Sequence, residues 1–376
     1  GVIMWIEIYQ LTPVGTVITV ELETICDTFS SLIWDVEYYS CGAFEIYIAA
    51  NAKNYAAFQI GKLVGRSDDK THYGIIESVQ LQTDAENGDY LTVTGRFLMS
   101  LLERRIIYPA LSFSSNTRYS QMIYTAIRLN CLQHDVRNLP GLAYDTATGD
   151  CWEQQAQLQV SYANLMEWIY QICEQVGGTA NVRLRKISDK QYDLAFTLSA
   201  GTDRSVLQSE NSPVIFSDTF QNLLGFGYSV DAATRKNVAY AFGAGEGEDR
   251  KRILCARGAE PEQLERYEIY VDAKDLQTTQ QNDAGETVEI PEDSYLAMLK
   301  ERGLEQLLPA SESSESTIAV NNPSYQYNVD YFVGDYVSIQ QDAFGLEQSR
   351  MQLVGMIETF DQNGRSLTPT FQTREV

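Results

Sequence analysis

Residues 87–107 read NGDYLTVTGRFLMSLLERRII, and this stretch decides the fold class. The pair Asn87-Gly88 predicts a type I′ hairpin turn, because both central residues of that turn need a positive φ angle. Leu91 and Val93 alternate with threonines, which predicts a strand with one apolar face. The leucines within residues 98–105 recur at helical spacing and predict a short helix directly after the strand. The stretch holds no catalytic group, so it points to architecture rather than to chemistry.

On both sides of this hairpin, most of the chain carries the signals of short strands. Phe44, Ile46 and Ile48 alternate with Glu45 and Tyr47, and turn signals separate such runs. This pattern is typical of a sandwich or a barrel. Because 376 residues are long for one core, we expect a β-rich α+β protein with several domains.

The pattern changes twice along the chain and so predicts three parts. The first is a β domain over residues 1–110, completed by about residues 200–235. The second is an α+β module with two helices over residues 111–199. The third is another β domain over residues 236–376, with a helix inserted at residues 292–308.

Helical spacing is plainest in the middle part. Apolar residues within Tyr119–Ile127 share one face, and those within Leu165–Val176 do so more clearly. Ser161 is the predicted cap of the second helix and Gly177 its stop.

The last third adds one helix and two polar segments. Pro291 is expected to start the helix at residues 292–308. Gln277–Glu289 is expected to be an exposed hairpin tip or mobile loop, and the Ser/Glu-rich Pro309–Ser316 a solvent-exposed segment. The pair Asn363-Gly364 predicts a second tight hairpin.

The charge balance is strongly acidic, with 28 basic against 51 acidic residues and a net charge of −23. Such a surface repels phosphates, which excludes nonspecific DNA binding through a basic face. Two interpretations stay open: simple solubility, or the wall of a channel that DNA passes without sticking. No run of 18 apolar residues predicts a membrane span, and the first residues do not have the pattern of a signal peptide.

Cysteine usage favours a protein folded in a reducing cytoplasm. No two cysteines form a Cys-x-x-Cys pair, and only His72 and His134 could join them, so we expect no zinc site. The six cysteines are Cys26, Cys41, Cys131, Cys151, Cys173 and Cys255.

Candidate catalytic groups are few, and each has a simpler interpretation. His134 and Asp135 could form a dyad, but a capping or solvent-facing histidine is favoured. The loop Gly243–Arg250 lacks the spacing of a phosphate loop and carries three acids, so it is better explained as a loop between strands. Asp283 and Glu286 lack a calcium-loop pattern. A glycosidase carboxylate pair cannot be selected among 51 acids.

Candidate binding residues are equally weak. Trp34 with Tyr38 and Tyr39 could form a carbohydrate platform, as could Trp152, but core and interface positions are favoured. The cluster Arg250–Arg252 is too short for a nucleic-acid patch. We therefore expect no catalytic, cofactor-binding or metal-binding residue and no enzymatic activity.

Several collinear runs resemble one known family, the siphovirus tail hub proteins of long-tailed bacteriophages and prophages. Together with residues 87–107 they cover nearly the whole chain. The further runs are Ser31–Tyr39, Gly42–Ile48, Gly201–Ser205, Pro213–Ser217, Asn222–Leu224, Asn237–Ala239, Gly245–Gly247, Tyr270–Leu276, Tyr327–Asp335 and Leu367–Phe371.

The resemblance implies two tail-tube-like β-barrels joined by a smaller α+β module, in a baseplate-hub-like protein. Three copies would form a ring that links the tail tube to distal tail and fibre proteins and lets DNA pass. The implied partners are the tail tube or distal tail protein, the tape measure protein, and fibre or receptor-binding proteins. The implied location is the tail tip of the virion, after assembly in the cytoplasm of the bacterial host.

Two other functions are weighed against this hub. One is a tail-associated cell-wall hydrolase, a glycosidase or peptidase, and the other is a carbohydrate-binding adhesin. Larger relatives carry hydrolase or fibre domains after the run Leu367–Phe371. No such domain is expected here, which argues against wall digestion or receptor binding by this chain.

Overall fold

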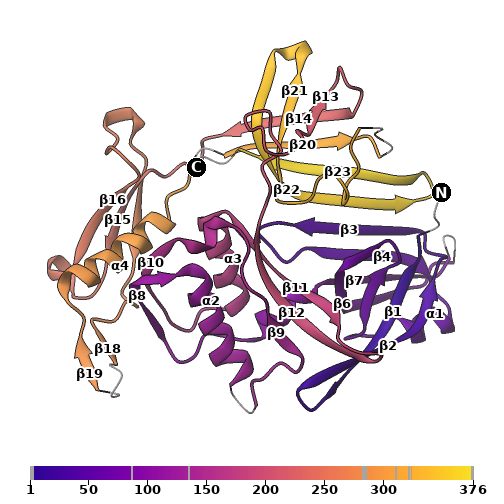
Figure 1. The fold of residues 1–376 in the computed structure, drawn as a ribbon, viewed down its shortest axis with the longest axis horizontal. Helices are drawn as coiled ribbons and strands as arrows, with labels where there is room; N and C mark the ends of the chain where they lie inside the picture. The colour runs from indigo at the N-terminus through magenta and orange to yellow at the C-terminus, as the bar shows by residue number, and fades with distance from the viewer. Residues whose placement is uncertain are drawn as a thin grey trace.

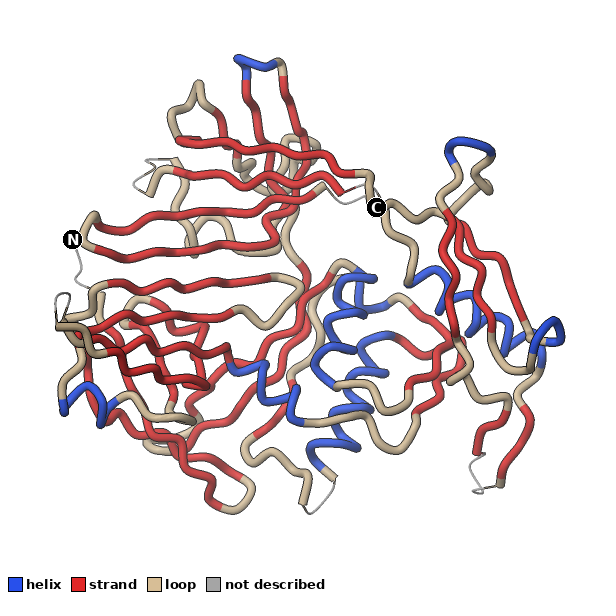
Figure 2. Tube along the Cα trace, turned by 180° about the vertical axis from the view of Figure 1, so that it is seen from behind, coloured by secondary structure: helices blue, strands red, loops and turns tan. Residues whose placement is uncertain are grey.

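The computed structural model describes residues 4–85, 88–133, 136–281, 286–309, 311–320, 322 and 324–373. Its main feature is one long sheet that passes through both halves of the chain, with helices beside its middle (Figure 1). Seen from behind, a smaller unit with its own strands and helix stands apart from the long sheet (Figure 2).

The N-terminal part forms a curled antiparallel sheet around an apolar core. The predicted hairpin is confirmed: Leu81 pairs with Leu91, and Val93 is buried in the core. Gly88 has a φ of +86°, whereas Asn87 lies outside the described residues. The elements are β1 (Ile6–Val14), β2 (Val17–Cys26), β3 (Ser31–Glu37), β4 (Ala43–Ala49), α1 (Ala52–Ala57), β5 (Leu63–Arg66), β6 (Asp69–Gln82), β7 (Tyr90–Phe97) and a 3₁₀ helix at Leu98–Arg104.

The middle part packs two helices against strands, and both predicted helices are present. The cap of the second helix is Asn164, whose side chain accepts a hydrogen bond from the N–H of Met166, so the prediction of Ser161 is wrong. A bridge to Ile106 keeps the chain extended as far as Asn164, and the helix begins after it. Gly177 ends it in the left-handed conformation, as predicted. The elements are β8 (Leu111–Arg118), α2 (Tyr119–Ile127), a π-helical turn (Arg128–Leu132), β9 (Leu142–Tyr144), a 3₁₀ turn (Asp150–Glu153), β10 (Gln155–Val160), α3 (Leu165–Val176), β11 (Gly178–Lys186) and β12 (Gln191–Ala200).

The C-terminal sheet includes a strand that the sequence analysis did not predict. The prediction of an exposed Pro309–Ser316 is wrong, because most of it belongs to a strand. Ser314 and Ser316 point into the core and hydrogen-bond each other at 2.8 Å, so small hydroxyl side chains take apolar positions there. The elements are β13 (Ile215–Ser217), β14 (Leu223–Asp231), β20 (Ser311–Ile318), β21 (Tyr336–Gln341), a 3₁₀ turn (Asp342–Phe344), β22 (Leu346–Asp361) and β23 (Gly364–Gln372).

Residues 232–309, here called the insertion, leave the long sheet after β14 and return at β20. A three-stranded sheet packs on the predicted helix, which begins after Pro291. The predicted polar tip is a two-stranded hairpin whose residues 282–285 lie outside the described residues. The elements are β15 (Val238–Phe242), a 3₁₀ turn (Gly247–Asp249), β16 (Arg252–Ala256), a 3₁₀ turn (Gln263–Glu265), β17 (Glu268–Asp272), β18 (Thr279–Gln281), β19 (Thr287–Glu289) and α4 (Glu292–Glu305).

The long sheet joins the two halves through their edge strands. Its order is β11-β12-β2-β1-β5-β6-β7-β4-β3-β22-β23-β20-β14, and β3 pairs with β22 over residues that are far apart in sequence. No pairing among the described strands closes either half into a barrel. The protein is therefore mostly β, with four separate apolar cores. No helix in the described part is long and apolar enough to cross a membrane.

Candidate assembly surface and cleft

Eight consecutive strands of the long sheet, from β14 to β6, have a core face and a predominantly polar face. Side chains alternate between the faces of a strand, and this alternation continues from one half into the other across β3 and β22. The large apolar or aromatic side chains on the predominantly polar face are those of Ile33, Ile357, Tyr47 and Tyr90. Its small and polar members, with which we define the polar face, are Gly227, Ser229, Ser313, Glu315, Thr368, Thr370, Gly355, Asp35, Glu37, Glu45, Thr92, Thr94, Ser78 and Gln80.

The polar face offers little positive charge. Its base is Arg96, which donates to Glu77 at 2.8 and 3.0 Å and also to Glu103. A shallow hollow of about 350 Å³ beside Arg96 is lined in part by Asp35 and Glu45. The carboxylates of this face repel phosphates, and Arg96 is already paired with two of its neighbouring acids.

Two carboxyl groups on β3 lie against each other on this face. Asp35 and Glu37 are two residues apart, so they point to the same side of the strand. Burial, together with the charge of Asp35, raises the pKa of Glu37 to about 7, and burial also raises the pKa of Asp35. Gly355, opposite Glu37 on β22, leaves room for that carboxyl, because a Cβ there would lie 3.0 Å from Glu37 Oε1.

The eight strands end in an open edge at β14 and in a partly open edge at β6. β14 pairs with β20 alone among the described strands. At the other end, the second half of β6, residues 77–82, extends past the residues that pair with β5. Apolar side chains stand beside both edges: Leu224 and Val230 on β14 are 66% and 57% exposed, and Leu81 on β6 is 53% exposed.

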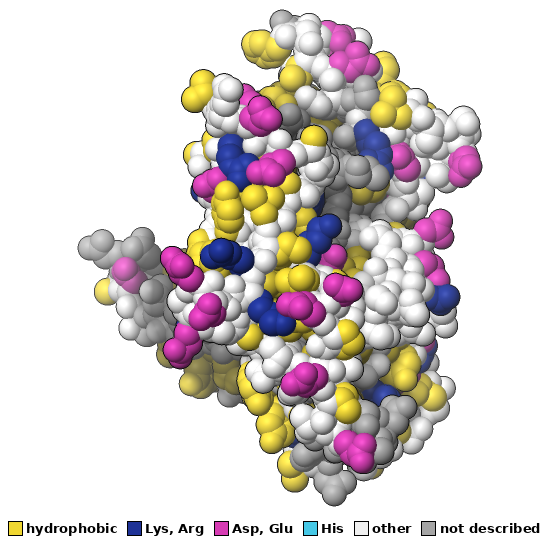
Figure 3. Space-filling view, turned by 90° about the vertical axis from the view of Figure 1, so that its left-hand side faces the viewer, with side chains coloured by type: hydrophobic (Ala, Val, Ile, Leu, Met, Phe, Trp, Pro, Cys, Tyr) yellow, Lys and Arg dark blue, Asp and Glu magenta, His cyan; other side chains and the backbone are white. Residues whose placement is uncertain are grey.

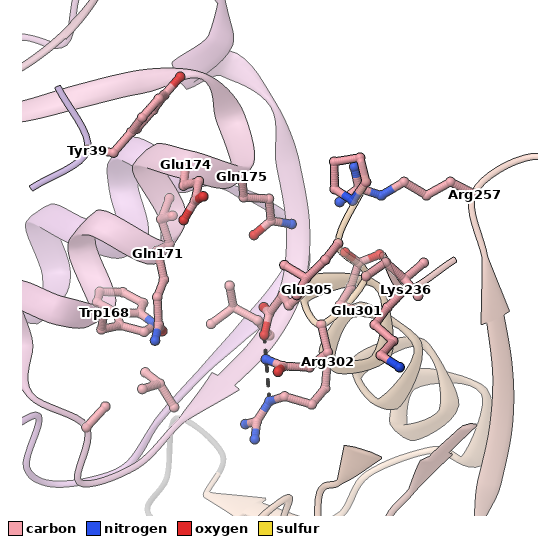
Figure 4. Close-up of a pocket in the computed structure, with 18 of the residues that line it drawn as sticks. Tyr39, Trp168, Gln171, Glu174, Gln175, Lys236, Arg257, Glu301, Arg302 and Glu305 are labelled. Carbon is pink, nitrogen blue, oxygen red and sulfur yellow. Dashed lines mark ion pairs between the residues drawn. The ribbon is translucent and has the colours of Figure 1, made fainter. Parts of the chain in front are cut away.

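A cleft of about 820 Å³ separates α3 from the insertion. Figure 4 shows Gln171, Glu174 and Gln175 on the α3 side, facing α4 across the cleft. Tyr39 and Gln352 also line it, and the Tyr39 hydroxyl donates to Gln352 Oε1 at 2.7 Å.

Carboxylates and bases are mixed in this cleft. Glu305 lies 3.8 Å from Arg302, which also pairs with Asp275 at 3.0 Å. Removal from bulk water by the cleft walls raises the pKa of Glu305 to about 7 although its side chain keeps contact with solvent, and burial also raises the pKa of Glu301. No group of three or more potential metal ligands occurs among the described residues.

The structure buries the aromatic residues considered for sugar binding. Trp34 and Trp152 are 0% exposed and Tyr38 is 2% exposed, so these three belong to cores. Tyr39 is half-buried and Glu286 is exposed in the insertion. His134, Asp135 and Asp283 lie outside the described residues.

The loop Gly243–Arg250 joins β15 to β16, as its interpretation as a loop between strands predicted. Arg250 donates to the carbonyls of Gly243 and Phe242 and to Asp272, so this base supports the loop. Lys251 pairs with Glu292 at 3.3 Å. The face of the molecule seen in Figure 3 intersperses acidic, basic and apolar side chains.

The sequence analysis did not identify one histidine–carboxylate pair, that of Asp69 and His72. Asp69 Oδ2 lies 2.8 Å from His72 Nδ1 and accepts a hydrogen bond from Trp34 Nε1 at 3.1 Å. Asp69 also accepts from the N–H groups of Thr71 and His72, which fixes the first residues of β6. The spacing Asp-x-x-His was the available signal, but this pair supports the start of a strand.

Three of the runs that carry the family resemblance meet at one junction. The Tyr38 hydroxyl accepts a hydrogen bond from Gly201 N–H at 2.9 Å. Asp335 accepts from Thr202 N–H and from Arg204, both at 2.8 Å. Gly201 packs so closely on the 334–335 backbone that no side chain fits between them. These runs therefore fix how the two halves of the chain meet.

Solved structures of tail proteins share this fold. A tail protein from Neisseria meningitidis MC58 aligns with a TM-score of 0.58 at 12% identity, covering 98% of this chain and 96% of that one. Prophage tail protein gp18 from Listeria monocytogenes EGD-e gives 0.53 at 13% identity, with coverages of 94% and 91%. The 43 kDa tail protein of prophage MuSo2 from Shewanella oneidensis gives 0.53 at 11% identity, with coverages of 97% and 98%.

No curated protein matches the chain closely enough to count as a relative. A family described as Siphovirus ReqiPepy6 Gp37-like protein matches residues 14–371, which is nearly the full length. This match confirms the tail-protein family that the quoted runs resemble. The chain belongs to the Siphovirus ReqiPepy6 Gp37-like family of phage and prophage tail proteins.

Proposed function

We propose that this tail protein is a hub at the tail tip, where three copies form a ring around a conduit for DNA. The observation that carries the proposal is the eight-stranded stretch of sheet that ends in an open edge at β14 and in the unpaired second half of β6. In a ring, β14 of one copy would lie beside β6 of the next. Such head-to-tail contacts close into a ring when the rotation between copies allows it.

The strand directions support this arrangement. All seven pairings from β14 to β6 are antiparallel. An even number of antiparallel strands leaves the two end strands running in opposite directions. Rotation about an axis along the strands keeps those directions, so the new contact between copies would also be antiparallel. A row of edge groups left without such a contact would invite uncontrolled association.

The polar face would then line the conduit, with its carboxylates toward the DNA. Like charge keeps a polyanion from adhering to a wall, which suits passage without specific binding. Each half of the chain would contribute a tail-tube-like barrel element to the ring. The hub would consist of the three parts predicted from the sequence, over residues 1–110, 111–199 and 236–376. The insertion and the outer loops would face the distal tail, tape measure and fibre proteins.

The oligomeric state of the purified chain tests the ring. Native mass spectrometry should give a species near three times the chain mass of 42.3 kDa. Leu224→Lys and Leu81→Lys, on opposite edges, should each leave monomers, since lysine on an edge opposes strand addition. Val14→Lys is a matched control, because Val14 is also 53% exposed but lies at the end of β1. Rings that persist in both edge variants, or a wild-type protein that stays monomeric when its tail partners are added, would refute the arrangement.

A second candidate is a cell-wall hydrolase that uses the cleft. The observation that favours it is Glu305, whose pKa of about 7 would suit a general acid. Zymography on purified cell wall decides between the two: clearing that disappears in Glu305→Gln supports the hydrolase. A wild-type chain that clears nothing rules out this role.

A further inference from the structure

Two exposed tyrosines stand side by side just before β8 and α3. The ring centres of Tyr108 and Tyr162 are 6.2 Å apart, and the two side chains are 57% and 64% exposed. The N–H of Tyr162 donates to the carbonyl of Ile107, and the N–H of Ile107 donates to the carbonyl of Ala163, so the backbone holds the two rings together. Tyrosine combines a large apolar ring with a polar hydroxyl and is enriched at protein interfaces, so this pair suits a contact with another molecule.

Tyr162 is held in a backbone conformation that disfavours tyrosine. Its φ is +58°, in the left-handed region that few residues other than glycine, asparagine and aspartate adopt. Burial of the ring does not offset this cost, because most of the side chain remains in water. Strained positions of this kind cluster where a protein binds or reacts.

Positive charge lies next to the tyrosine pair. Arg137 donates to the carbonyls of Tyr108 and Ile106 at 3.1 and 2.6 Å, and Arg105 donates to the carbonyl of Arg137 at 2.8 Å. A carbonyl has no net charge, so both guanidiniums keep their full positive charge. Arg104, the neighbour of Arg105 in the chain, has an exposed side chain.

No acid in the described part of the chain neutralises these three arginines by an ion pair. Glu103, which precedes Arg104, pairs with Arg96 instead. Elsewhere most described arginines face carboxylates, as Arg66 and Arg185 do. Unpaired positive charge is therefore gathered at one place on a chain with a net charge of −23. We call this place the arginine–tyrosine surface, and its members are Arg104, Arg105, Ile106, Tyr108, Arg137 and Tyr162.

We propose that the arginine–tyrosine surface binds an acidic segment of another tail protein, one that also carries apolar or aromatic side chains. Guanidinium groups match carboxylates in both charge and geometry. The two rings and the exposed Ile106 give apolar side chains of the same segment an area to cover. Arginine and tyrosine are also the residue types that supply much of the binding energy in protein interfaces. The proposal does not depend on the ring described above.

Two other occupants fit this surface less well. DNA would bring its whole backbone charge up to a strongly acidic protein, and three arginines are few against that repulsion. A second copy brings the same net charge, without the strand-to-strand hydrogen bonds that the β14 and β6 edges would offer. A short acidic segment brings only a few charges, which the local arginines offset.

Binding of two fluorescent probes to the purified chain tests the chemistry of the surface. One probe is poly(Glu,Tyr), a copolymer of glutamate and tyrosine, and the other is a single-stranded oligothymidylate of similar charge. Fluorescence anisotropy should show that the wild type binds the copolymer more tightly than the oligonucleotide. Raising the salt concentration from about 50 to about 200 mM should weaken this binding, since exposed charges are screened. A wild type that binds neither probe, or that prefers the oligonucleotide, would overturn the proposal.

Two variants show whether this binding occurs at the arginine–tyrosine surface. Arg104→Glu and Tyr162→Asn should each weaken binding of the copolymer by about tenfold. Both should keep the wild-type thermal unfolding, because the Arg104 side chain forms no ion pair with the described residues and asparagine tolerates the left-handed conformation. Arg252→Glu is the matched charge reversal at an exposed position of β16 and should bind like the wild type. Undiminished binding in both variants, or an equal loss in Arg252→Glu, would contradict the assignment.

Photo-crosslinking in assembled virions identifies the source of the segment. Tyr108 is replaced by the photoreactive p-benzoylphenylalanine, and mass spectrometry identifies the peptide attached after irradiation. This peptide should belong to another tail protein and contain more Asp and Glu than Lys and Arg. The same replacement at Tyr55, which is 53% exposed on α1, is the control and should not give this crosslink. Attachment of position 108 to DNA, to a second copy or to a segment without excess acid would refute the proposal, as would no crosslink in virions that contain the protein.

Discussion

Arg66 and Glu358 form a buried ion pair that joins the two halves of the chain. Arg66 Nη1 lies 2.9 Å from Glu358 Oε1 although the residues are 292 positions apart, and their side chains are 2% and 0% exposed. Arg365 donates to the same carboxylate at 2.9 Å. The Arg66 guanidinium also stacks on Phe360 of β22 at 4.6 Å from its ring centre. The contact between β3 and β22 is therefore supported on its core side by a satisfied charge network.

Removing the carboxylate should be costly. Glu358→Ala leaves the guanidinium of Arg66 buried with only Asp68 as a partner, and Arg365 also loses its acceptor. We expect the free energy of unfolding to fall by about 3–5 kcal/mol, the usual cost of breaking a buried pair from one side. Urea denaturation followed by circular dichroism measures it. Glu347→Ala, at an exposed position of the same strand, should change stability by less than about 0.5 kcal/mol. Equal effects of the two variants would show that the buried pair contributes little.

Glu37 should make stability depend on pH. Its pKa is raised to about 7 in the folded protein, so it stabilises the fold below its unfolded pKa of about 4.5, and this contribution is lost as the pH rises through 7. Glu37→Gln should therefore match the wild type near pH 4 and exceed its stability by about 1–3 kcal/mol near pH 8.5. Guanidinium denaturation at both pH values measures the difference. Glu45→Gln, an exposed carboxyl on the next strand, is the control and should show no such gain.

Gly201 should tolerate no side chain. A Cβ at this position would lie 1.8 Å from the carbonyl oxygen of Gly334, and this oxygen belongs to backbone that cannot easily move. Gly201→Ala should destabilise the protein by about 2–4 kcal/mol or prevent the halves from meeting. Gly225→Ala is the matched control, since its nearest neighbour would be an ordinary 3.4 Å away. Thermal unfolding compares them, and a Gly201→Ala protein as stable as the control would contradict this account.

Local elements were predictable because their signals lie within a few residues. The hairpin around Gly88 and the helix Leu165–Val176 follow from turn chemistry and from apolar spacing, and both are present. The strand Ser311–Ile318 was missed because serines occupy its core positions, so the strand has no apolar alternation. A capping position was also missed, since a bridge to Ile106 decides where α3 begins.

Features that join distant segments had no signal in the sequence. The pairing of β3 with β22 and the ion pair between Arg66 and Glu358 need the whole fold. The same holds for Asp35 and Glu37: their spacing puts them on one face, but only the packing of β22 beside them removes both from water. The cleft around Glu305 forms between parts that are more than a hundred residues apart, so composition could suggest acids in a channel but not their positions.

The polar face gives a final prediction that concerns the tail rather than the isolated chain. Glu45→Lys and Glu315→Lys reverse two exposed charges in the two halves of this face. Both should fold and assemble, because among the described residues neither carboxylate forms an ion pair with a base. If the face lines the conduit, the double variant should bind passing DNA and slow its release from purified virions, and added salt should partly restore the rate, since phosphate contacts weaken with salt. Glu248→Lys makes the same reversal on the insertion and should leave release unchanged. Release at the wild-type rate in the double variant, from virions that contain the protein, would place this face elsewhere than in the path of the DNA.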